Sequence, residues 1–77
     1  MKVLVEMTDT FGGQPNYCWL QCHTLEMPDD LHPTAVVRRA KRALSMQHVR
    51  CRREDDGTTI TLRPYAWARV IFITYPV

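Results

Sequence analysis

The sequence is poor in several features that mark large classes of protein. It has only three glycines and five prolines in 77 residues, and 45% of its residues are hydrophobic against 23% charged. This composition excludes a collagen-like repeat and is not that of a disordered tail or a coiled coil. We therefore expect a single globular domain over residues 1–77, too small to contain a dinucleotide or nucleoside-triphosphate fold.

Long apolar runs are also missing. The longest strongly apolar run is the four residues from Val70 to Ile73, whereas a membrane helix needs about 20. The apolar run near the N-terminus ends after three residues at Glu6, so we expect no signal peptide and no membrane association. Three cysteines make an odd count, which does not favour a closed disulfide framework. The expected location is a reducing cytoplasm.

Acidic residues are absent from one long stretch of the chain. Ten Lys and Arg against eight Asp and Glu give a net charge of +2, too small by itself to indicate nucleic acid. Seven of the ten basic residues nevertheless lie in the stretch that we call the basic cluster: Arg38, Arg39, Lys41, Arg42, Arg50, Arg52 and Arg53. Such a cluster creates a local positive field. The acids at positions 54–56 beside it disfavour contact with a long duplex.

The first residues alternate as the residues of a strand do. Val3, Val5 and Met7 occupy every second position, which predicts a strand with one apolar face over residues 3–8. Two glycines and a proline within residues 9–16 then predict a loop.

Residues 17–26 predict a second strand, because aromatic and β-compatible residues dominate them. One expected face carries Tyr17, Trp19, Gln21 and His23, and the other carries Cys18, Leu20, Cys22 and Thr24.

The most regular pattern in the chain predicts a helix. Its apolar positions recur with helical spacing and form one stripe made of Val36, Val37, Ala40, Ala43 and Leu44. The opposite side carries Arg38, Lys41, Arg42 and Ser45. We expect Asp29 and Asp30 at the N-terminal end, where carboxylates accept free amides, and Pro33 in the first turn.

Three further strands complete the predicted fold. Residues 48–53 form one, with Val49 and Cys51 inward, and residues 58–63 form the next after the turn signal Asp56-Gly57. The segment Val70–Ile73 is apolar on both faces, as a central strand is. The predicted fold class is α+β: a ββαβββ order, one mostly antiparallel sheet and a single helix packed on one face.

No spacing of residues predicts a metal or catalytic site. On a strand, Cys18 and Cys22 lie about 13 Å apart at roughly 3.3 Å per residue, too far to share a zinc ion. Arginines beside Cys51 would lower its pKa if they were close, but strand neighbours point apart, and no third group orients His48. We interpret the thiols as small buried side chains, and predict no cofactor, no metal and no enzymatic activity.

The residues most typical of a binding surface are aromatic. Tyr65 and Trp67, flanked by Arg63 and Arg69, combine a large apolar area with a polar tip, as residues at interface hot spots do. The same residue types stack on single-stranded bases. The alternative is that Trp67 covers the small core. Phe11, in a loop with glycine and proline, is either a binding anchor or a plug that folds back.

Three segments of the chain resemble small uncharacterised proteins of phages and prophages. They are Phe11-Gly12-Gly13-Gln14-Pro15-Asn16-Tyr17-Cys18-Trp19, Val37-Arg38-Arg39-Ala40-Lys41 and Val49-Arg50-Cys51-Arg52-Arg53-Glu54. The resemblance spans most of the chain but brings no catalytic motif with it. It implies a context, because short phage proteins often inhibit a host machine by binding it, anti-CRISPR proteins among them.

We therefore predict a non-enzymatic binding protein, a phage-derived inhibitor of the anti-CRISPR type that blocks a bacterial defence complex in the host cytoplasm. Its partner would be a bacterial host protein or a ribonucleoprotein complex. The candidate partner-binding residues are Phe11, Arg38, Lys41, Arg42, Arg50, Arg52, Tyr65 and Trp67. The alternative is a small nucleic-acid-binding module in which the basic cluster contacts phosphates. A homodimer through a rim strand is also open.

Overall fold

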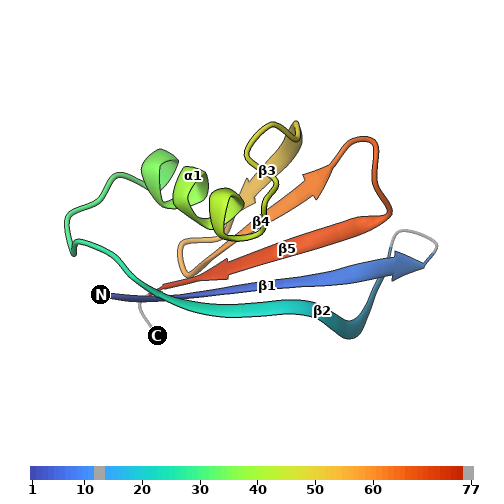
Figure 1. Cartoon of the computed structure of the whole chain (residues 1–77), viewed down its shortest axis with the longest axis horizontal. Coiled ribbons are helices and arrows are strands. Elements are labelled where there is room, and N and C mark those ends of the chain that lie inside the picture. The colour runs from blue at the N-terminus through green and yellow to red at the C-terminus, as the bar shows by residue number, and fades with distance from the viewer. Residues whose placement is uncertain (12–13, 76–77) are drawn as a thin grey trace.

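The computed structural model describes residues 1–11 and 14–75, and the side chains of residues 1–10 and 20–75. Its elements are β1 (Lys2–Phe11), β2 (Gln14–Glu26), α1 (Pro33–Ala43), β3 (Cys51–Asp55), β4 (Thr59–Pro64) and β5 (Arg69–Thr74). The strands form one sheet in the order β2-β1-β5-β4-β3, and every pair is antiparallel (Figure 1). The predicted α+β fold class and the ββαβββ order are confirmed. Within the described residues, no helix has the length and apolar character needed to cross a membrane.

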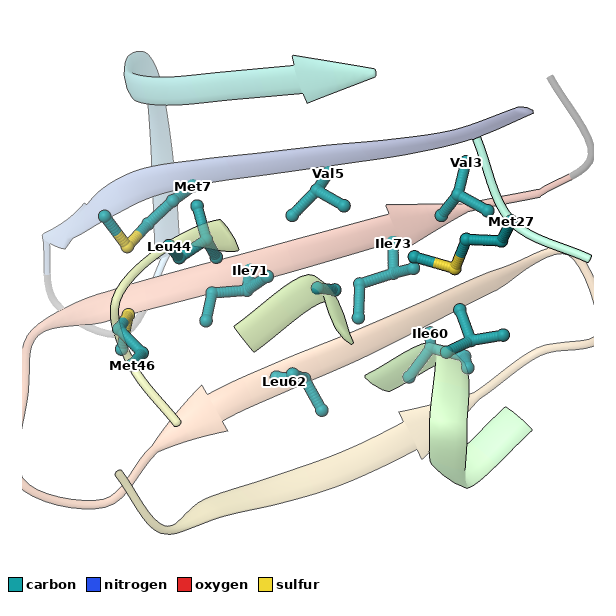
Figure 2. Close-up of a cluster of buried hydrophobic side chains, with 12 residues drawn as sticks. Val3, Val5, Met7, Met27, Leu44, Met46, Ile60, Leu62, Ile71 and Ile73 are labelled. Atoms are coloured by element: carbon teal, nitrogen blue, oxygen red, sulfur yellow. The ribbon is translucent and has the colours of Figure 1, made fainter. Parts of the chain in front are cut away.

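One face of the sheet and the apolar stripe of α1 form the core (Figure 2). Alternate residues of β1, β4 and β5 point to this face, and each is at most 2% exposed. These sheet residues are Val3, Val5, Met7, Ile60, Leu62, Ile71 and Ile73. The helix contributes Val36, Ala40 and Leu44, as its periodicity predicts. Met27 and Met46 lie near the two ends of the cluster.

The strand that the sequence predicts to be central does lie in the middle of the sheet. β5 pairs with β1 on one side and with β4 on the other. Val70 and Ile71 are adjacent in sequence and both fully buried, although neighbours on a strand point to opposite faces. The continuous apolar run of this strand therefore reflects burial on both faces at this end of the sheet.

The β1–β2 hairpin is longer than the sequence predicts. Residues 9–16 were expected to form a loop, but β1 continues to Phe11 and β2 begins at Gln14. The ladder pairs Thr10 with Pro15, so strand pairing overrides the local glycine and proline signal. A proline is tolerated there because β2 is an edge strand.

The pairing of β2 with β1 is also irregular. Its register shifts between Met7 and Thr8, where Met7 is opposite Gln21 but Thr8 is opposite Trp19. An unpaired residue, Leu20, lies between these two pairs, as in a β-bulge. The single alternation expected through this strand is therefore interrupted at position 20.

The helix does not begin as the sequence predicts. Asp29 and Asp30 precede it without capping it, and no acidic residue lies in its first turn. His32 is the N-cap, and its Nδ1 accepts the amide of Thr34 at 3.1 Å. Pro33 occupies the first turn as expected. The Asp29 carboxylate instead accepts the amino group of Met1 at 2.6 Å, which lowers the pKa of Asp29 below its ordinary value.

The strand after the helix begins later than predicted. Residues 48–53 were expected to form it, but the Val49 amide donates to the Met46 carbonyl at 3.0 Å and closes a turn, and β3 starts at Cys51. Val49 and Cys51 are partly buried against the core, as expected. The predicted Asp56-Gly57 turn is confirmed by the positive φ of 96° at Gly57.

The second residue after α1 has an uncommon backbone conformation. Ser45 has a φ of 58°, in the left-handed region that favours glycine. Its amide donates to the Arg42 carbonyl at 3.0 Å, and the Met46 amide donates to the Lys41 carbonyl at 2.8 Å. This pair of bonds is a Schellman motif, in which glycine usually occupies the position of Ser45.

Replacing this serine should therefore stabilise the fold. We expect Ser45→Gly to raise the free energy of unfolding by about 0.5–1 kcal/mol, because glycine adopts a positive φ without a Cβ penalty. Urea unfolding followed by circular dichroism measures the change. Ser45→Ala is the control and should show no gain. A glycine variant no more stable than the wild type would contradict the assignment.

Candidate partner-binding surface

Two loops at one end of the sheet bring Arg50, Tyr65 and Trp67 together. Residues 65–68 connect β4 to β5, and residues 47–50 lead into β3. Between them lies a hollow of about 630 Å³, which we call the loop groove, lined by His48, Val49, Arg50, Tyr65, Ala66 and Trp67. Three of the residues predicted to bind a partner thus share one site.

The aromatic rings of this site are exposed. Tyr65 is 71% and Trp67 43% exposed, and neither is among the side chains packed against the core. This exposure favours the binding interpretation over the alternative, in which Trp67 covers the core. Two large side chains that contribute little to the interior and stand beside a cation form a surface of the composition found at interface hot spots.

Backbone hydrogen bonds hold the two loops in place. The Tyr65 amide donates to the Arg50 carbonyl at 3.1 Å, which extends the β3–β4 ladder into the groove. The Thr10 amide donates to the Ala68 carbonyl at 2.9 Å, which ties the same loop to the end of β1. The loop that carries both rings is therefore fixed to strands on either side, so little ordering remains to be done on binding.

A second set of contacts fixes the ring of Trp67. The Arg69 guanidinium carbon lies 5.1 Å from the centroid of the indole, a cation–π contact. Arg69 Nε also lies 3.8 Å from the Asp9 carboxylate. These groups surround a separate hollow of about 440 Å³, lined by Asp9, Trp67, Ala68 and Arg69. Trp67 borders both hollows, so one side of the residue is occupied by Arg69 while another borders the loop groove.

The helix presents its basic residues outward, as predicted. Arg38 and Arg42 are exposed and make no ion pair with any other described residue. Lys41 is less free, because its ammonium group donates to the Val49 carbonyl. Arg38 and Lys41 line a shallow hollow of about 230 Å³ that also includes Gln47. Gln47 lines this hollow and the next residue, His48, lines the loop groove, so the same connection borders both.

The basic cluster is not one patch. Arg52 pairs with Glu54 at 3.2 Å, and Arg53 pairs with Asp55 at 3.6 Å. Arg53 is opposite Leu62, on the face that α1 covers, so Arg52 points to the other face. Adjacent strand residues point to opposite sides of a sheet, and a run of arginines in sequence is therefore divided in space. The structure does not bring Arg52 together with the helix arginines.

Phe11 is the last residue of β1, next to Thr10 and hence at the same end of the sheet as the loop groove. Its side chain lies outside the described residues.

The cysteines differ from the expectation of buried thiols in one case. Cys22 is exposed, because it lies on the edge strand and on the face that α1 leaves open. Cys51 is partly buried, and burial raises the pKa of its thiol, against the opposing effect of Lys41. A thiol with a raised pKa is a weak nucleophile at neutral pH. Among the side chains that the structure describes, no group of three His, Cys, Asp or Glu residues could hold a metal ion.

Sequence reasoning missed two members of this surface. His48 was assigned to a strand, and Asp9 to a loop, without a role in binding. His48 could have been found from its position two residues before Arg50. The role of Asp9 had no signal, because its contact with Arg69 joins segments far apart in sequence.

No family model, no curated protein and no solved structure matches the chain. The function is therefore inferred from the chemistry of this surface.

The contact between Arg69 and Trp67 predicts how the ring behaves. Arg69→Gln removes a cation–π contact of about 0.5–1 kcal/mol at an exposed site, so the indole should populate more rotamers. ¹⁵N relaxation of the indole N–H measures this as a lower order parameter, with the signal assigned by its loss in Trp67→Phe. Arg52→Gln, which removes a guanidinium on β3, is the control. Unchanged indole order in Arg69→Gln would contradict the positioning role.

Proposed function

We propose that the chain is a non-enzymatic binding protein that attaches to a larger macromolecule through the loop groove. The observation that carries this proposal is the pair of exposed rings, Tyr65 and Trp67, held beside Arg50 by loops that backbone hydrogen bonds join to each other and to β1. Residues of these types supply most of the energy of many protein interfaces. The Arg69 contact supports a ring already oriented for binding.

The charge of the molecule supports the approach of an acidic partner. Arg38, Arg39 and Arg42 are exposed on α1 and have no acidic neighbour among the described residues within ion-pair distance. Unpaired charges outside a contact raise association rates more than they raise affinity. The rings thus provide the contact area, and the helix arginines steer the partner towards it.

The resemblance to small phage and prophage proteins gives this binding a context. In that context the protein is an inhibitor of the anti-CRISPR type, acts in the cytoplasm of a bacterial host and blocks a defence complex, a host protein or a ribonucleoprotein. Cys22 and Cys51 are unpaired thiols, in agreement with a reducing compartment.

The inhibitor proposal predicts a specific loss of function. Expression of the wild type in bacteria with an active CRISPR defence should restore plaque formation by a targeted phage, whereas Trp67→Ala should not. Truncating a hot-spot tryptophan costs about 2 kcal/mol or more, a weakening of roughly 30-fold. Purification of the tagged protein from the same cells should recover components of the defence complex with the wild type and not with the variant.

Lys2→Ala is the matched control, because Lys2 is an exposed cation at the start of β1, whereas the other end of this strand is bonded to the loop that carries the rings. Circular dichroism should show that Trp67→Ala remains folded, since the ring lies outside the core. Absence of plaque rescue by the wild type in every defence type tested, or full rescue by Trp67→Ala, would overturn the proposal.

A second candidate function is a small nucleic-acid-binding module. One observation favours it: Arg38, Arg39, Arg42 and Arg50 carry no ion pair with a described residue, and Arg50 lines the groove beside two rings. Because Arg52 and Arg53 are paired with acids on their own strand, the phosphate contacts would be few.

Gel-shift titrations separate the two candidates. The nucleic-acid module should shift single-stranded RNA or DNA more strongly than duplex, with a log–log salt slope of about −0.7 per phosphate neutralised. Arg50→Gln should reduce that slope, and Arg52→Gln should not. A protein that shifts no nucleic acid at low salt, yet restores plaques, is a protein-binding inhibitor.

A further inference from the structure

The two edges of the sheet differ in chemistry. The edge strand β3 carries four consecutive exposed charges, Arg52 to Asp55. Charged side chains on an edge discourage further pairing in natural sheets. The regularly paired part of the other edge, residues 21–26 of β2, has Glu26 at its end as its only Asp, Glu, Lys or Arg. The β2 edge is therefore the one left open to a further strand.

The alternation of hydrogen-bonded and non-bonded residue pairs between β1 and β2 shows which backbone groups of β2 are free to pair with another strand. The Met27 amide donates to the Met1 carbonyl at 2.9 Å, and bonded pairs alternate with non-bonded pairs along an antiparallel ladder. The bond from the Thr10 amide to the Ala68 carbonyl, on the β5 side of β1, agrees with this alternation. Gln21, His23 and Leu25 therefore bond to β1. The N–H and C=O groups of Cys22 and Thr24 point away from it, out of the edge.

We propose that a second copy of this chain pairs with β2, antiparallel, about a two-fold axis at His23. His23 lies between Cys22 and Thr24, the two residues inside the regularly paired stretch 21–26 whose backbone groups point out of the edge. In this register Cys22 of each copy exchanges both backbone bonds with Thr24 of the other, so every outward donor of the pair meets an acceptor.

The side chains on this edge suit a second copy. Cys22 and Thr24 are exposed and small, and no Asp, Glu, Lys or Arg lies next to the backbone groups that would pair. Leu20, one of the exposed large apolar residues at 43%, would face Glu26 of the other copy and lose part of its exposure. The two sheets would join into one continuous sheet whose outer edges are the charged β3 strands.

This pairing goes beyond the proposed function and leaves its site open. The loop groove is built from residues next to β3 and β4, at the opposite side of the sheet from β2. A dimer would carry two open grooves, and two linked sites bind a repeated target more tightly than either site alone.

Removal of one outward amide tests the pairing. Thr24→Pro deletes an N–H that does not bond to β1, so the fold should persist while the dimer is lost. Light scattering after size exclusion should give twice the 9.0 kDa chain mass for the wild type and the single mass for the variant. Arg53→Pro is the matched control. Because Arg50 and Tyr65 form a hydrogen-bonded pair, the alternation along the ladder makes Arg53 and Leu62 a non-bonded pair, and the Arg53 amide points out of the β3 edge. This variant should remain dimeric.

Two further variants keep the test decisive. Thr24→Lys places cations of both copies near the axis and should also give a monomer, which decides the matter if Thr24→Pro unfolds. Cys22 residues of the two copies would lie roughly 8–9 Å apart, within reach of a short bis-maleimide, and Cys22→Ser should abolish that cross-link. A wild type of single mass at all concentrations, a folded dimeric Thr24→Lys, or a cross-link that survives Cys22→Ser would overturn the proposal.

Discussion

The contact between the apolar stripe of α1 and the covered face of the sheet is the constraint on which the other features depend. The helix has 11 residues, fewer than an isolated helix needs to be stable in water, so it persists only while Val36, Ala40 and Leu44 are buried. Ile71 and Ile73 would face water without it. Each such burial contributes about 1.5–3 kcal/mol, which offsets the entropy of ordering the chain.

This contact decides which side chains are free to bind. Because α1 turns its apolar side to the sheet, Arg38 and Arg42 must face solvent. The loop between β4 and β5 lies beyond the end of the core, so Tyr65 and Trp67 are exposed without loss of core packing. The fold can therefore carry a rigid aromatic surface at one end at little cost to its own stability.

The groove and the open edge lie on opposite sides of the sheet, and their chemistry differs. The groove combines rings with cations and suits a large partner of complementary charge. At its centre the β2 edge offers the outward backbone groups of two small residues, Cys22 and Thr24, and suits a strand. Because the groove lies next to β3 and β4, and β2 is the strand at the other edge, pairing at β2 and binding at the groove do not compete.

The sequence by itself determined the features that repeat locally. The period of 3.6 placed Val36, Ala40 and Leu44 on one side of a helix, and the unbroken apolar run of Val70–Ile73 identified the central strand. Exposed aromatic residues were also recognisable, because Tyr65 and Trp67 lie between strands in a segment without an apolar period.

Tertiary structure alone decided the rest, because those features depend on partners distant in sequence. Pairing with β1 drew Pro15 into a strand, and alternation across β3 moved Arg52 away from the helix arginines. The ring of Trp67 is oriented through Arg69 by Asp9, a contact between the first strand and the last. A local sequence pattern indicates which face of a strand a residue occupies, but only the pairing of strands decides which residue lies opposite it.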